Sequence, residues 1–166
     1  MESVRDLARW RAMGQSENIE VVTDSVEETL EVARTLSREL DEGAVVLLYG
    51  ELGAGKTVFA QGLSDARGIA ARQVQSPTYT LVHEYGGDQQ QGPLVIHVDL
   101  YRVDADEIES LGLEELFATP ALKIVEWADR LTWQPEGSCR VRIERISGDQ
   151  RKINIDETCE PVKLAN

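Results

Sequence analysis

The residues best suited to do chemistry are eight consecutive ones, which read Gly-Glu-Leu-Gly-Ala-Gly-Lys-Thr from Gly50 to Thr57. They fit the G-x-x-x-x-G-K-T pattern of a phosphate-binding loop. Glycines let the backbone curl so that several N–H groups point into one concavity, and a following helix adds its positive N-terminal end. We expect Lys56 to bind the β- and γ-phosphates and Thr57 to offer its hydroxyl to Mg²⁺. The sequence therefore predicts a nucleoside triphosphate site.

Two other apolar runs end in a carboxylate, 94–99 at Asp99 and 122–126 at Glu126. Ligands of open α/β sheets bind beyond the carboxyl ends of the parallel strands, so parallel strands here would bring both acids near the phosphates. One acid can hold Mg²⁺ or its water shell, and the other can orient or deprotonate the attacking water. The spacing leaves open which acid does which. We expect His97 to be a hydrogen-bonded, half-buried histidine rather than a catalytic one.

The loop at 74–80, Val-Gln-Ser-Pro-Thr-Tyr-Thr, occupies the place of the nucleotide-sensing segments of GTPases. Thr78 or Thr80 can bind Mg²⁺ or sense the γ-phosphate there. The alternative is a capped turn fixed by Pro77. Trp127 follows Glu126 and is predicted to be a packing residue.

The elements that must position these residues alternate between helices and strands. Apolar spacing, caps and turn residues predict helices at 26–40, 55–66, 104–110 and 113–117, and strands at 44–49, 79–85, 94–102, 121–125, 140–146 and 151–155. The connectors at 86–93 and 147–150 predict two antiparallel hairpins. The fold class is therefore α/β, a three-layer fold of the P-loop NTPase type with a mixed, mainly parallel sheet and antiparallel hairpins.

The composition limits the class of protein. The 166 residues carry a formal charge of −13 and are 42% hydrophobic, which suits one domain at 19–166 after an extension at 1–18. The apolar runs are too short for a membrane span, and the two cysteines suit a reducing cytoplasm. Because phosphate binding needs clustered cations, the acidity argues against binding DNA or RNA alone. An acidic chain can still serve a nucleic-acid pathway through a basic partner.

Four segments together resemble the TsaE family of small bacterial P-loop ATPases. They are 50–57, Ser-Pro-Thr-Tyr-Thr-Leu at 76–81, Asp-Leu-Tyr-Arg at 99–102 and Val-Glu-Trp at 125–127. The resemblance runs from about Val22 to Arg151. The family acts in forming threonylcarbamoyladenosine in tRNA, together with TsaD, which transfers the group, and TsaB.

The resemblance implies that the chain binds ATP and Mg²⁺, hydrolyses ATP slowly when alone, and meets tRNA only through the complex with TsaD and TsaB. It implies Thr57, Glu126 and Asp99 at the metal, with Asp99 as the Walker B-like acid. Thr78 would be the switch-like threonine, acting in catalysis with Lys56, Asp99 and Glu126. The implied nucleotide-binding residues are Gly50, Glu51, Leu52, Gly53, Ala54, Gly55, Lys56, Thr57, Val58, Thr23, Ser25 and Arg151.

Two other functions share the same loop. A small-molecule kinase usually has an arginine-rich lid, whereas the positive charges here are scattered. A nucleotide-gated binding module would hydrolyse ATP only incidentally. A GTPase is disfavoured because the sequence has no N-K-x-D motif.

Overall fold

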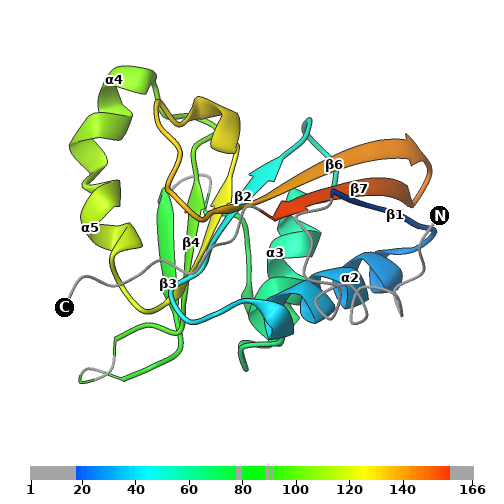
Figure 1. Cartoon of the computed structure of the whole chain (residues 1–166), viewed down its shortest axis with the longest axis horizontal. Coiled ribbons are helices and arrows are strands. Elements are labelled where there is room, and N and C mark those ends of the chain that lie inside the picture. Colours follow the sequence, from blue (N-terminus) through cyan, green and yellow to red (C-terminus); the bar gives the residue numbers. More distant parts are fainter. Residues whose placement is uncertain (1–17, 78–79, 89, 91, 158–166) are drawn as a thin grey trace.

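The strands form one twisted sheet, and helices cover both of its faces (Figure 1). The computed structural model describes residues 18–77, 80–88, 90 and 92–157. The strands are β1 (Ile19–Thr23), β2 (Val45–Tyr49), β3 (Val82–Tyr85), β4 (Val95–Asp99), β5 (Leu122–Glu126), β6 (Cys139–Ser147) and β7 (Gln150–Glu157). The helices are α2 (Val26–Glu39), α3 (Lys56–Asp65), α4 (Ala105–Ile108) and α5 (Leu113–Phe117), with short 3₁₀ turns at 71–73, 109–111 and 128–130.

The sheet is mixed, and its centre is parallel. Its seven strands follow the order β1-β7-β6-β2-β5-β4-β3, in which β6, β2, β5 and β4 run parallel to one another. Both predicted hairpins are present, because β3 pairs antiparallel with β4 and β6 pairs antiparallel with β7. The parallel strands therefore direct their carboxyl ends to the same edge of the sheet, which is where the predicted acids were expected to meet.

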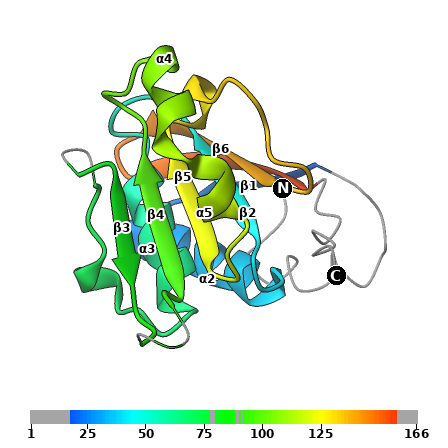
Figure 2. The same ribbon diagram turned by 90° about the vertical axis from the view of Figure 1, so that its left-hand side faces the viewer.

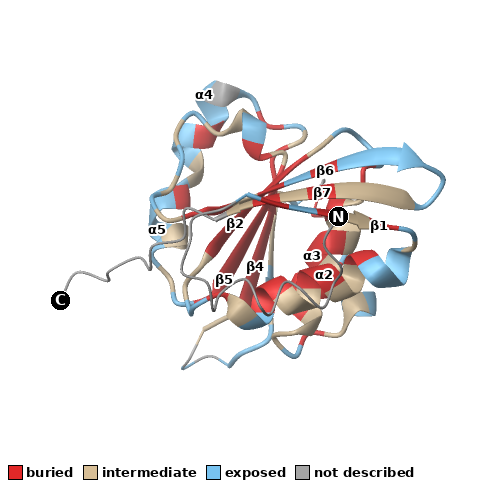
Figure 3. Cartoon of the chain, turned by 45° about the vertical axis from the view of Figure 1, so that its right-hand side comes forward, coloured by how far each residue is buried: buried red, intermediate tan, exposed pale blue. Residues whose placement is uncertain are grey.

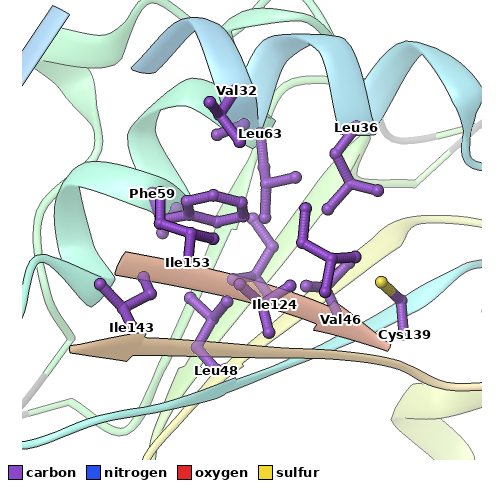
Figure 4. Close-up of a cluster of buried hydrophobic side chains, with 14 of the residues drawn as sticks. Val32, Leu36, Val46, Leu48, Phe59, Leu63, Ile124, Cys139, Ile143 and Ile153 are labelled. Carbon is purple, nitrogen blue, oxygen red and sulfur yellow. The ribbon is translucent and has the colours of Figure 1, made fainter. Parts of the chain in front are cut away.

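Helices cover the two faces of the sheet in separate groups. Figure 2 shows α2 and α3 behind the sheet and α5 in front of it, which gives the predicted three layers. In the core under α2 and α3, Phe59 and Leu63 pack on strand residues such as Leu48 and Ile143 (Figure 4). The α2 helix begins as predicted, since the Ser25 hydroxyl accepts from the Glu28 N–H at 3.1 Å.

A second core lies on the opposite face, between the sheet and α4 and α5. β2 contributes to both cores by strand alternation, so all five of its residues are buried. Figure 3 shows the same burial for β4 and β5, whereas the second half of β6 is exposed. Among the described residues, no helix has the length and apolar character needed to cross a membrane.

The structure moves two boundaries of the predicted strands by three residues each and adds one strand. β4 ends at Asp99 rather than Arg102, because the Asp99 carboxylate accepts from the Tyr101 N–H at 2.8 Å and the chain turns there. β3 begins at Val82 rather than Tyr79, and residues 78–79 lie outside the described part. The strand β1 was not predicted at all. It pairs with β7, more than 120 positions away in the sequence.

Candidate active site

The loop between β2 and α3 has a backbone that only glycine allows at its two ends. Gly50 has φ +150°, and a Cβ there would overlap the Ile143 carbonyl oxygen of the neighbouring β6. Gly55 has φ +110° and precedes the first residue of α3. A side chain at either position would strain the turn. The first N–H groups of α3 therefore lie at the loop, as an anion-binding site requires.

Lys56 extends from α3 across the start of this loop. Its ammonium donates to the Gly50 and Glu51 carbonyl oxygens, at 2.6 and 2.9 Å. It also lies 3.9 Å from the centre of the Trp127 ring. Burial lowers the pKa of the ammonium, and the negative charges of Glu126 and Asp99 oppose that shift. An ammonium has three N–H donors, so two hold the loop and one remains for an anion.

Thr57 lies beside Glu126, the last residue of β5. The Thr57 hydroxyl donates to the Glu126 carboxylate, 3.0 Å from Oε1 and 3.2 Å from Oε2. The Nε2 atom of His97 is also 2.9 Å from Oε1. Glu126 is 3% exposed and His97 is fully buried, so the carboxylate lies in a largely dry site. The prediction that His97 forms a hydrogen bond is confirmed, but the prediction that it is half-buried is wrong.

Asp99 lies beside Glu126, because the two residues are register partners in the parallel pair β4–β5. The Ser76 hydroxyl donates to Asp99 Oδ2 at 2.5 Å, and the Tyr101 N–H donates to Oδ1. These contacts hold a nearly buried carboxylate one strand away from Glu126. The predicted meeting of the two acids at one edge of the sheet is confirmed.

The oxygen atoms of this site suit Mg²⁺. Thr57 and Glu126 bring a hydroxyl and a carboxylate together, and hard cations prefer such oxygen ligands. In the described part of the chain, no group of three or more acidic, histidine or cysteine side chains could hold a metal alone. Mg²⁺ commonly takes only one or two protein ligands and completes its shell with phosphate oxygens and waters. The site therefore fits a cation that arrives with a phosphate ligand.

A pocket of about 770 Å³ lies between the loop and β6. Its size is within the range of small-molecule sites. Aromatic and charged side chains form its wall together with the loop backbone. Among them, the guanidinium carbon of Arg142 lies over the Tyr49 ring, 5.3 Å from its centre. The lining residues are Tyr49, Gly50, Glu51, Leu52, Ala54, Trp127, Asp129, Arg142, Ile143, Glu144 and Arg145. A group bound there would lie next to the loop.

Comparisons with known proteins point to one family. The family described as "Threonylcarbamoyl adenosine biosynthesis protein TsaE" matches residues 23–153. The chain belongs to the TsaE family. The TsaE protein of Bacillus subtilis is 39% identical over 135 residues, which cover 80% of this chain and 82% of that protein. The TsaE protein of Aquifex aeolicus is 37% identical over 140 residues, which cover 82% and 94%.

A solved structure has a similar fold over most of this chain. The crystal structure of Bacillus subtilis YdiB matches with a TM-score of 0.65 and 29% identity. The match covers 86% of this chain and 87% of that one. The predicted P-loop-type α/β fold is therefore confirmed.

The remaining residues implied by the TsaE resemblance lie in different settings. Arg151 is the register partner of Thr23, and its Nε–H donates to the Ala54 carbonyl of the loop at 2.7 Å. The Thr23 hydroxyl is buried, 2.8 Å from the Thr29 hydroxyl, and the Ser25 hydroxyl caps α2. Arg151 therefore touches the loop directly, whereas Thr23 and Ser25 have structural contacts. Thr78 lies outside the described residues.

Four contacts of this TsaE site were not predicted from the sequence, although His97 was expected to form a hydrogen bond with some partner. Trp127 packs as expected, but its ring also covers the Lys56 ammonium and lies 4.8 Å from the Tyr101 ring. His97 binds Glu126, and Ser76 binds Asp99. Tyr101 follows Asp99 by two residues and Trp127 follows Glu126 directly, and these short spacings were the available signal for the ring pair.

Proposed function

We propose that the chain is a Mg²⁺-dependent ATPase that supports threonylcarbamoyl transfer to tRNA adenosine together with TsaD and TsaB. The observation that carries the proposal is the joint placement of Lys56 across the loop and of Thr57 on Glu126. These are the two functions that a triphosphate with its metal needs from a protein, namely a positive charge at the phosphates and oxygen ligands at the cation. The family to which the chain belongs supplies the pathway.

Each residue then has a role that its contacts allow. The loop N–H groups and the remaining Lys56 donor bind the phosphates, and Arg151 braces the loop through Ala54. Thr57 and Glu126 would hold Mg²⁺, and the ion would supply positive charge at the phosphates. Asp99, held by Ser76 and the Tyr101 N–H, is the candidate to orient the attacking water.

The partners follow from the family and from charge. A net charge of −13 disfavours direct tRNA binding, so tRNA would be met through the complex with TsaD and TsaB. A cytoplasmic location of this chain stays a prediction.

The direct test replaces the loop lysine. We expect Lys56→Ala to lower ATP affinity and turnover at least tenfold, because the ammonium both fixes the loop and meets the phosphates. Calorimetry and phosphate release are the measurements, made with and without TsaB and TsaD. Lys152→Ala is the control, since Lys152 lies on β7 and its ammonium pairs with Glu20 of β1 at 3.4 Å. Normal binding and turnover in Lys56→Ala would contradict the proposal.

The pocket beside the loop keeps phosphoryl transfer to a small molecule as a second candidate. Mass analysis of the products separates the two reactions, because an ATPase releases free phosphate and a kinase gives a phosphorylated metabolite. A nucleotide-gated module is separated by Glu126→Gln. If that variant hydrolyses no ATP and still supports tRNA modification fully, hydrolysis is incidental.

A further inference from the structure

The histidine inside the sheet is an unusual residue for its position. His97 is the middle residue of β4, where its four neighbours in the strand are Val95, Ile96, Val98 and Asp99. It is fully buried. Burying a polar side chain is unfavourable unless it forms hydrogen bonds, and an aliphatic residue would fill the same place without that cost. The hydrogen bond of His97 to Glu126 is therefore the feature that needs an explanation.

The direction of this bond follows from its two partners. An ionised carboxylate only accepts hydrogen bonds, so the proton between Nε2 and Glu126 Oε1 belongs to His97. The other ring nitrogen, Nδ1, is buried and has no hydrogen-bond partner among the described residues. A proton on Nδ1 would leave a buried donor unsatisfied, which is unfavourable. Both facts select the tautomer that carries its proton on Nε2.

The contacts of Glu126 are unequal as a result. In the part of the chain that the structure describes, Oε1 accepts from both His97 and Thr57, whereas Oε2 accepts only from Thr57, at the longer distance of 3.2 Å. The ring of His97 is held between strands, with Ile124 and His83 as its register partners on the two sides. It therefore fixes the carboxylate from a rigid part of the sheet, and Oε2 retains more of its capacity to accept.

We propose that His97 is a positioning residue, whose Nε2–H bond orients the Glu126 carboxylate so that Oε2 is presented to Mg²⁺ or to a water of its shell. The inference rests on the proposed function, because it assigns His97 to the metal of that same site. Hydrogen-bonding partners behind a ligand commonly change metal affinity about 10- to 100-fold when they are removed. His97 would act only through Glu126 and would touch neither nucleotide nor metal.

The test measures how strongly Mg²⁺ assists nucleotide binding. The quantity is the ratio of the Kd for a non-hydrolysable ATP analogue in EDTA to its Kd in Mg²⁺, determined by calorimetry. We expect His97→Leu, which lacks the donor, to lower this ratio about tenfold or more while the Kd in EDTA stays within twofold. We expect His97→Gln to retain most of the ratio, since its amide can donate from a similar distance along the side chain.

Val95→Ala is the matched control for loss of packing. Val95 is fully buried, lies two residues before His97 on the same strand face, and has no polar contact to the site. We expect it to lower the melting temperature and to leave the Mg²⁺ ratio unchanged. If Val95→Ala lowers the ratio as much as His97→Leu does, the effect comes from packing and the inference is wrong.

A second measurement needs no change at His97. The chain has two histidines, so the His83→Asn protein leaves one set of imidazole nitrogen signals in an NMR spectrum. We expect those signals to show the proton on Nε2, and a proton on Nδ1 would overturn the inference. The two proposals fail differently. If the unaltered protein binds no nucleotide, the proposed function is refuted and this inference with it. A normal Mg²⁺ ratio in His97→Leu refutes only the role of His97.

Discussion

A buried lysine makes the stability of this fold depend on pH in an unusual direction. Lys123 is fully buried in β5, on the face opposite Glu126, and its ammonium donates to the carbonyl oxygens of Gly43 and Thr119 at 2.7 and 2.6 Å. Burial lowers the pKa of Lys123 from 10.5 to about 8. The folded chain therefore releases this proton at a pH where the unfolded chain still holds it.

The sign and the size of the effect follow from that difference. Between about pH 8 and the unfolded pKa near 10.5, the unfolded state binds more protons, so the free energy of unfolding rises with pH. Each pKa unit corresponds to about 1.4 kcal/mol, so the contribution is roughly 1.4 kcal/mol between pH 7 and 9 and approaches about 3 kcal/mol at higher pH. Below about pH 7 the lysine is charged in both states and the contribution disappears.

The assay is urea unfolding at several pH values from 7 to 9.5, for the unaltered protein and for Lys123→Met. Methionine keeps much of the side-chain length without a titrating group. Lys56, whose pKa is also lowered by burial, and Tyr49, whose pKa is raised by burial, are present in both proteins. Their effects cancel in the difference between the two. A difference that stays constant from pH 7 to 9.5 would refute the reasoning.

Three further predictions concern packing, capping and charge. A Cβ on Gly62 would lie 2.6 Å from the Ala33 Cβ and the Leu30 carbonyl oxygen, so Gly62→Ala should lower the free energy of unfolding by about 1–3 kcal/mol in urea. An unchanged free energy of unfolding would show that α2 and α3 can move apart enough to fit the methyl group without losing packing. Ser25→Ala removes the cap of α2, and we expect a loss of about 1 kcal/mol by the same assay. The isolated chain, at −13, should bind tRNA weakly and lose that binding steeply between 50 and 200 mM salt in anisotropy titrations. Tight binding at physiological salt would contradict the indirect route to tRNA.

The sequence predicted the parts of the site that depend on local pattern. The loop at 50–57 carries its own backbone requirements in its glycines, and a strand that ends in an acid places that acid at the end of the sheet. Neither step needed knowledge of distant contacts. This is why Lys56, Thr57, Asp99 and Glu126 came together as predicted.

The parts that were missed depend on partners far along the chain. β1 alternates between buried and partly exposed residues over five positions, too short a pattern to be recognised without its partner β7. His97 looked half-buried because histidine usually is, and only β3 and β5 on either side enclose it. Lys123 lies in an apolar strand, and nothing in the local sequence indicates that its ammonium donates to two carbonyl oxygens.

The pairing of Asp99 with Glu126 limits where proteins with this fold can gain or lose residues. Consecutive strand residues point to opposite faces, so one residue inserted within β4 or β5 would turn the carboxylate beyond it toward the wrong layer. The segment that links the two strands contains α4 and α5, and its length does not affect which face a strand residue points to. It can therefore gain or lose residues while both strands stay in register. Insertions and deletions in proteins with this fold should therefore accumulate between the two strands and be nearly absent within them.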